Sequence, residues 1–266
     1  MTLPNSWVLF YVHEKEELYD QKRLQRFFTG LAECNCYVAP ESELASLVIW
    51  RKYLVNAPAP EKQKKGRGPF AAALKPGVSE GLRREALIYM AERMEQLTVA
   101  VRSMARSPLV RGFELTVTLA PVEGYILLSV EQERFFRPSI EGLAKYRYWI
   151  KIIEKTYACW QPLYAHEFTH QGPPSVNPSW EEVRALEIPE LYALNIYGPE
   201  LVQQIGQARL LDAPAWVVRE LEGSGCLLIP TDRYGVAPGS YDHDDVARYL
   251  GFPVSMQESM SDESSR

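Results

Sequence analysis

The sequence contains few cysteines, and they form no pairing pattern. The 266 residues include four of them, Cys34, Cys36, Cys159 and Cys226. One residue separates Cys34 from Cys36, whereas structural zinc sites use two-residue spacing and a second cysteine pair. A chain of this length can bury its own core without disulfides. We therefore expect free thiols in a reducing compartment.

Targeting and membrane-spanning signals are also missing. The first apolar run stops at His13 and has no basic region before it, so it is too short for the core of a signal peptide. No stretch approaches the roughly 20 apolar residues that a spanning helix requires. The sequence therefore predicts a cytoplasmic protein with no membrane partner.

The sequence has fewer basic than acidic residues, and its net charge is -5. Proteins that bind nucleic-acid backbones normally present a basic face, so we expect no direct nucleic-acid binding. The one basic stretch, residues 56–69, has no aromatic side chain to stack on a base and is interpreted as a solvated loop. An acidic chain can instead offer an acidic face to a basic partner.

The spacing of apolar residues predicts an α+β fold with a mostly antiparallel sheet and flanking helices. Hairpins are indicated where two alternating stretches are separated by a short turn, as at Gly223-Ser224-Gly225. Strand patterns cover residues 6–13, 46–54, 112–120, 124–131, 191–197, 215–222 and 225–231. Helical patterns cover residues 21–33, 79–106, 139–158, 200–208 and 242–250, and Pro138 is placed to open the third of these.

Domain organisation follows from the proline-rich stretch and the tail. We predict a single α+β domain over residues 1–254, with two subdomains meeting near residues 160–180 as the alternative. Residues 255–266 are polar and of low complexity, so they are predicted to be a disordered tail.

One motif resembles a metal site. The letters His166-Glu167-Phe168-Thr169-His170 match the His-Glu-x-x-His pattern of zinc hydrolases. On a helix, the two imidazoles share one face and bind zinc, while the Glu acts as general base on a bound water. A zinc-dependent hydrolase is therefore the alternative function, with His166 and His170 as ligands and Glu167 as the base.

The surroundings of this motif argue against that function. Pro162 and the run Gly172-Pro173-Pro174 leave at most two turns of helix around it. The third ligand that zinc requires has no good candidate in the sequence. We therefore expect a protein that is not an enzyme, with no catalytic residues, no bound metal and no cofactor.

The last third of the chain resembles a known family. Residues 191–206, 210–216 and 222–229 contain a strand, a Gly-Pro turn, a short helix and a hairpin. They resemble the C-terminal part of bacterial polymorphic-toxin immunity proteins of the type called immunity protein 52. The resemblance implies a non-enzymatic α+β protein that binds and neutralises a cognate toxin, in the setting of type VI secretion. It implies a nuclease as the toxin class.

The residues themselves give one candidate for the partner-binding surface. Trp180, Glu181 and Glu182 place an aromatic ring beside two acids after the proline-rich stretch. The alternative is that these residues only begin a helix, with Ser179 as the cap and Glu182 as its capping-box partner. Both interpretations stay open from the sequence.

Overall fold

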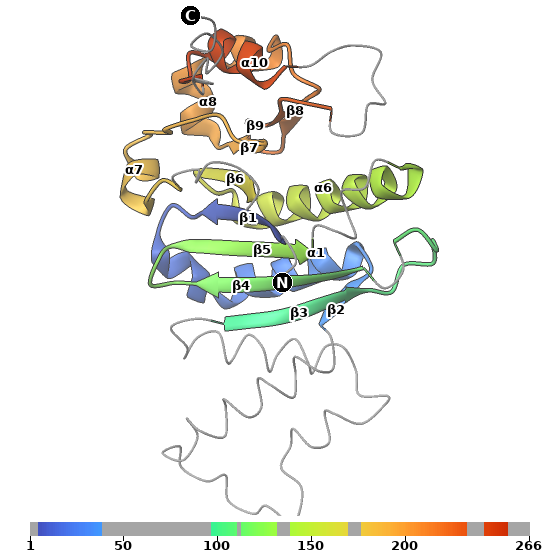
Figure 1. Cartoon of the computed structure of the whole chain (residues 1–266). Helices are drawn as coiled ribbons and strands as arrows, with labels where there is room; N and C mark the ends of the chain where they lie inside the picture. The colour runs from blue at the N-terminus through green and yellow to red at the C-terminus, as the bar shows by residue number, and fades with distance from the viewer. Residues whose placement is uncertain are drawn as a thin grey trace, which may run out of the picture.

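The centre of the molecule is one antiparallel sheet (Figure 1). The computed structural model describes residues 5–38, 97–110, 113–131, 139–169, 177–232 and 242–254. Within these ranges the strands are β1 (Asn5–Tyr11), β2 (Cys36–Val38), β3 (Leu97–Ser103), β4 (Glu114–Ala120), β5 (Tyr125–Glu131), β6 (Tyr164–Thr169), β7 (Leu194–Tyr197), β8 (Val217–Leu221) and β9 (Gly225–Ile229). They lie in the order β2-β3-β4-β5-β1-β6-β7-β9-β8, and every neighbouring pair is antiparallel.

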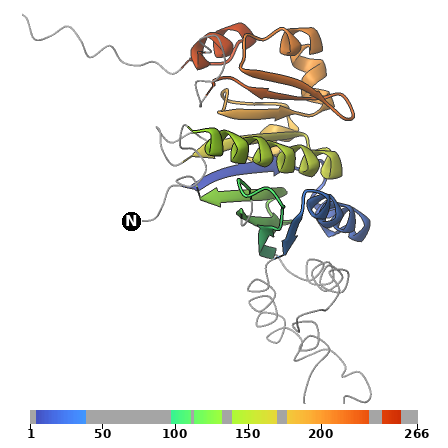
Figure 2. The ribbon, with the colours of Figure 1, turned by 90° about the vertical axis from the view of Figure 1, so that its right-hand side faces the viewer.

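Helices cover both faces of this sheet, so the α+β class is confirmed. They are η1 (Lys15–Tyr19, a 3-10 helix), α1 (Gln21–Glu33), α6 (Ile140–Trp160), α7 (Trp180–Arg184), α8 (Pro199–Ile205), α9 (Gln207–Leu211) and α10 (His243–Leu250). The buried side chains of α1 and α6 pack on one face, and those of α7 to α10 pack on the other. The orange and red helices, including α8 and α10, gather at the end of the sheet formed by β7 to β9 (Figures 1 and 2).

The central strand explains why one sheet can hold two cores. β1 lies between β5 and β6, and alternate residues of a strand point to opposite faces. Val8 and Phe10 belong to the core under α1 and α6, whereas Leu9 and Tyr11 belong to the core under α7 to α10. A strand buried on both faces needs an unbroken apolar run, which is what residues 7–12 provide.

Side-chain caps fix where several helices begin. Asp20 accepts hydrogen bonds from the first backbone N–H groups of α1, and Asp242 does the same for α10. Ser139 caps α6 through the N–H of Gly142, so Pro138 precedes the cap and is not the first helical residue that the sequence predicted.

The sequence-based helix over residues 79–106 is wrong at its C-terminal end. Residues 97–103 form β3, paired with β2 and β4. Val99 and Val101 are buried, and they are separated by two positions, as on a strand. Leu97 and Val101 also suit a helical stripe, and this ambiguity misled the prediction. The predicted strand over 46–54 and basic loop over 56–69 lie outside the described residues.

The C-terminal predictions are confirmed with small shifts. The hairpin of β8 and β9 turns at Glu222-Gly223-Ser224, one residue before the predicted turn, and the last helix begins after Asp242. The helix predicted over residues 200–208 is two helices, α8 and α9, because Gly206 between them has φ +100°. In the part of the chain that the structure describes, none of the helices combines the length and apolar character needed to cross a bilayer.

The junction between β7 and α8 gives a test of the fold. A Cβ atom at Gly198 would lie 2.6 Å from the carbonyl oxygen of Pro162 and 2.7 Å from that of Leu163. Backbone atoms cannot move aside easily, so we expect Gly198→Ala to lower the free energy of unfolding by about 3 kcal/mol. Urea denaturation measures this. Ala208→Ser, at an exposed position of α9, is the control and should change stability by less than about 0.5 kcal/mol; equal effects would contradict the packing described.

Candidate functional site

The motif that resembles a zinc site lies on strand β6, not on a helix. β6 runs from Tyr164 to Thr169 and pairs with β1 and β7. Consecutive residues of a strand point to opposite faces, so His166 and Glu167 lie on different sides of the sheet. His170 lies outside the described residues. The sequence allowed at most two turns of helix here, and Tyr164–Thr169 form a strand instead, so these residues lack the helix on which the hydrolase alternative depends.

His166 is enclosed by aromatic rings. Its ring centroid lies 4.0 Å from that of Tyr192, 5.5 Å from that of Tyr164 and 5.9 Å from that of Tyr11. The rings of Tyr11 and Tyr164 are nearly parallel to the imidazole, at 12° and 19°. Stacked aromatic contacts of this kind stabilise a core beyond the area that they bury. His166 therefore packs as an aromatic side chain.

Burial also keeps the His166 imidazole neutral. The residue has no exposed surface, and burial lowers its pKa to about 3. Its Nδ1 has no hydrogen-bond partner among the described residues, and its Nε2 lies 3.5 Å from the Tyr11 hydroxyl. A proton-transfer role requires hydrogen-bond contact with a substrate or with solvent, which this buried position does not give.

A buried amide fixes the tyrosines around His166. The Asn195 side-chain oxygen accepts hydrogen bonds from the Tyr164 hydroxyl at 2.7 Å and from the Tyr192 backbone N–H at 3.1 Å. The Asn195 side-chain nitrogen donates to the Tyr192 carbonyl at 2.7 Å. The Tyr11 hydroxyl donates to the carbonyl of Pro178 at 2.8 Å. A satisfied network of this kind rigidifies the core that supports α7 to α10.

Glu167 lies in the opposite core. It is 1% exposed and accepts a hydrogen bond from the Ser6 hydroxyl of β1. The described residues contain no group of three His, Cys, Asp or Glu side chains placed to hold a metal ion. Glu167 and His166 therefore lie in two different cores of the fold.

Trp180 anchors helix α7 to the sheet. Its indole N–H donates to the carbonyl of Val12 at 2.8 Å, just beyond the end of β1. Gly124 lies so close to the ring that a Cβ atom there would be 2.7 Å from it. Lys15 and Arg184 lie over the ring at 4.8 and 4.9 Å. These contacts give α7, a helix of five residues, a fixed position.

The two acids beside Trp180 differ in their roles. Glu182 closes a capping box with Ser179, since each side chain accepts a hydrogen bond from the backbone N–H of the other. The Ser179 N–H holds the pKa of the Glu182 carboxyl below its usual range. The helix-start interpretation is thus confirmed for Ser179 and Glu182. Glu181 is exposed, and the partner-binding role of Trp180, Glu181 and Glu182 stays a prediction.

Negative charge is concentrated in the part of the chain that includes these residues. Residues 177–254 contain 12 acidic and five basic residues, a net charge of -7. Residues 1–176 contain 19 acidic and 23 basic residues, a net charge of +4. We call helices α7 to α10, with the described residues next to these helices, the acidic layer; the β8–β9 hairpin is not part of it. Its exposed carboxylates come from every one of these helices or the residues next to them: Glu181, Glu182, Glu187, Glu200, Asp212, Asp242 and Asp245.

Helices α1 and α6 carry the opposite charge. They contain seven basic and three acidic residues. Because these helices and the acidic layer cover different faces, the sheet separates a positive surface from a negative one. Whole-chain charge hides this separation, but counting charge by segment would have revealed it from the sequence.

Two other kinds of potential nucleophile occur in the chain, a serine in a glycine-flanked pattern and the four cysteines. The pattern Gly-x-Ser-x-Gly occurs at residues 77–81, outside the described residues. The thiols of Cys34, Cys36, Cys159 and Cys226 are all free and buried. Burial raises the pKa of each of these thiols, so they behave as small apolar side chains and not as nucleophiles.

The chain shows little similarity to known proteins. No protein-family model matches the chain, and no curated protein does. A solved structure of a Pseudomonas aeruginosa T6SS protein aligns over 94% of this chain and 72% of its own length, with 12% sequence identity and a TM-score of 0.38. A TM-score of 0.38 is below the level at which two chains share a fold.

The burial of His166 predicts how stability depends on pH. The unfolded chain takes up a proton on this imidazole near pH 6.5, whereas the folded protein does so only near pH 3. Above about pH 6.5 this group therefore does not affect the free energy of unfolding. Below that pH the free energy of unfolding falls by about 1.4 kcal/mol per pH unit, until the pH reaches about 3. His166→Phe removes the imidazole. It should lower the slope of the unfolding free energy against pH, between pH 6 and 4, by about 1.4 kcal/mol per pH unit.

Denaturant unfolding at several pH values measures that slope. His13→Gln is the control, because it removes a half-exposed histidine and leaves the His166 contribution in place. A His166→Phe protein with the wild-type slope would contradict the burial described here.

Proposed function

We propose that this protein binds and neutralises a cognate bacterial toxin, and that the acidic layer is the surface that meets it. The observation that carries the proposal is the net charge of -7 on residues 177–254, in a chain whose residues 1–176 have a net charge of +4. The toxin is an effector of type VI secretion with a nuclease activity, as the resemblance to immunity proteins implies. Its substrate-binding surface is basic, since a nuclease holds a phosphate backbone.

Electrostatics supports this pairing. A surface with one sign of charge attracts a partner of the opposite sign and raises the rate of association, most strongly at low salt. An inhibitor that acts inside the producing cell gains from fast association, because free toxin damages the cell until it is bound. Covering a basic substrate groove also blocks the nuclease directly.

The rigidity of α7 supports a role for this helix in the contact. Trp180 fixes the helix through Val12, and the Arg184 side chain forms an ion pair with Glu14 at 2.7 Å. Glu181 and Glu187 are exposed on and just after this anchored helix. A preorganised surface loses less conformational entropy on binding, so its charges contribute more to affinity.

Charge reversal tests the proposal with the toxin encoded beside this protein's gene. We expect Glu181→Lys combined with Glu187→Lys to lower the association rate about tenfold at low salt, with a smaller difference at high salt. Both side chains are exposed, so the fold should be unaffected. Surface plasmon resonance measures the rate, and survival of cells that express the toxin measures the protection.

The matched control is Glu114→Lys combined with Glu141→Lys. These changes alter the net charge by the same amount at exposed sites on β4 and α6, away from the acidic layer. They also break the surface ion pairs of Glu114 with Arg102 and of Glu141 with Lys145, and exposed pairs of this kind contribute little to stability. The control should bind and protect nearly as the wild type does. No binding by the wild-type protein, or equal losses in the two double variants, would contradict the proposed function.

A further inference from the structure

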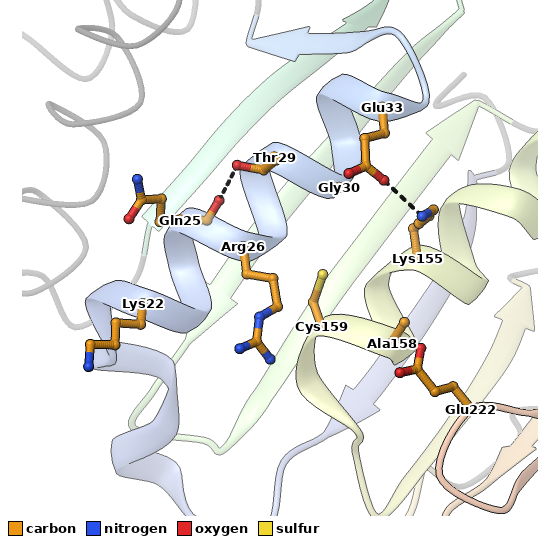
Figure 3. Close-up of a pocket in the computed structure, with 10 residues that line it drawn as sticks. All are labelled: Lys22, Gln25, Arg26, Thr29, Gly30, Glu33, Lys155, Ala158, Cys159 and Glu222. Carbon is orange, nitrogen blue, oxygen red and sulfur yellow. Dashed lines mark hydrogen bonds and ion pairs between the residues drawn. The ribbon is translucent and has the colours of Figure 1, made fainter.

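Helices α1 and α6 enclose a groove on the face of the sheet opposite the acidic layer. Figure 3 shows this groove, whose volume is about 550 Å³. Pockets that bind ligands commonly have volumes of roughly 300–1,000 Å³, so the groove is large enough for a short segment of polypeptide. The turn between β8 and β9 contributes Glu222 to its wall.

Small residues keep the floor of the groove open. A Cβ atom at Gly30 would lie 3.3 Å from the Cys159 sulfur, so α1 and α6 approach each other closely at this point. Ala158 is next to Cys159 on α6 and also lines the groove. The Arg23 guanidinium donates to the Trp160 carbonyl at 3.3 Å and fixes the two helices together. The groove is therefore a built feature of the helix pair.

Some charged side chains in the groove have an ion-pair partner among the described residues, and others have none. At one end Lys155 forms an ion pair with Glu33 at 2.8 Å, drawn as a dashed line in Figure 3. Lys22 and Arg26 are exposed, and neither side chain forms an ion pair with a residue that the structure describes. The Arg26 side chain extends from α1 into the space beside α6 (Figure 3). Two cations one helical turn apart are thus free to bind carboxylates.

From this arrangement we propose that the α1–α6 groove binds a short acidic segment of a partner protein. The carboxylates of the segment pair with Lys22 and Arg26. An Arg side chain suits this role, because its planar guanidinium accommodates a carboxylate with two parallel hydrogen bonds. The proposal does not depend on toxin neutralisation, since the groove and the acidic layer lie on different faces.

The lining favours an acidic peptide over a nucleic acid. None of the residues that line the groove is aromatic, so no ring is available to stack on a base. Glu33 and Glu222 stand in its walls and repel a continuous phosphate backbone. A peptide can instead place its carboxylates only where the cations are and turn neutral groups toward these acids.

Fluorescence anisotropy with a labelled peptide that has two glutamates separated and flanked by glycines, Gly-Gly-Glu-Gly-Glu-Gly-Gly, tests the proposal. The full-length protein should bind this probe at low salt. Lys22→Glu combined with Arg26→Glu should weaken binding at least about tenfold. Ala158→Phe should weaken it by a similar factor, because it fills the groove and leaves every charge in place. Circular dichroism checks that both variants are folded.

A charge-matched control separates the groove from general attraction. Arg106→Glu combined with Arg147→Glu reverses two exposed cations that do not line the groove, and binding should stay within about twofold of wild type. Absence of binding by the wild-type protein would overturn the proposal, as would equal losses in the control or unchanged binding in Ala158→Phe.

Two experimental results would assign the groove to a different ligand. Equal or tighter binding of a six-nucleotide DNA strand would assign the groove to nucleic acid and overturn the proposal. Self-association of the wild-type protein in sedimentation, lost on combining Lys22→Glu with Arg26→Glu, would assign it to a second copy and overturn the proposal as well.

Discussion

The alternation of side chains across the central strands is the constraint on which the rest of the structure depends. β1 and β6 are buried on both faces, so each of their residues must suit one of two cores. This rule places His166 among tyrosines under the acidic layer and Glu167 beside Ser6 under α1 and α6. A register shift of one residue would exchange these surroundings and expose both cores to unsuitable side chains.

The same sheet keeps two oppositely charged surfaces apart. Seven basic residues of α1 and α6 lie on one side, and the acidic layer lies on the other. Charges separated by a packed sheet interact weakly, because salt screens exposed charges beyond about 8–10 Å. Each surface can therefore attract its own kind of partner without neutralising the other. The net charge of -5 describes neither surface.

Much of the fold was predictable from local patterns. The run from Trp7 to Val12, the hairpin turn at Glu222-Gly223-Ser224 and the capping box of Ser179 with Glu182 each depend on residues close together in the sequence. The site at His166 was not predictable in this way. Tyr11 is 155 positions away from it along the chain, and only the pairing of β1 with β6 brings the two rings together.

Residues 97–103 and the His-Glu-x-x-His letters failed for one physical reason. Both stretches are short, and the spacing of a few residues cannot distinguish a helix from a strand until neighbouring strands supply hydrogen bonds. β4 supplies them for residues 97–103, and β1 and β7 supply them for residues 164–169. The charge separation could have been predicted, because acidic residues outnumber basic ones by 12 to five in residues 177–254 and are outnumbered, 19 to 23, in residues 1–176.

The proposed contact of the acidic layer with the toxin can be tested by hydrogen–deuterium exchange of this protein, alone and in complex with the toxin encoded beside its gene. We expect slower exchange on binding in residues 180–212 and 243–250, and unchanged exchange in α1 and α6. Protection that falls on α1 and α6 and leaves the acidic layer unchanged would contradict the proposed contact.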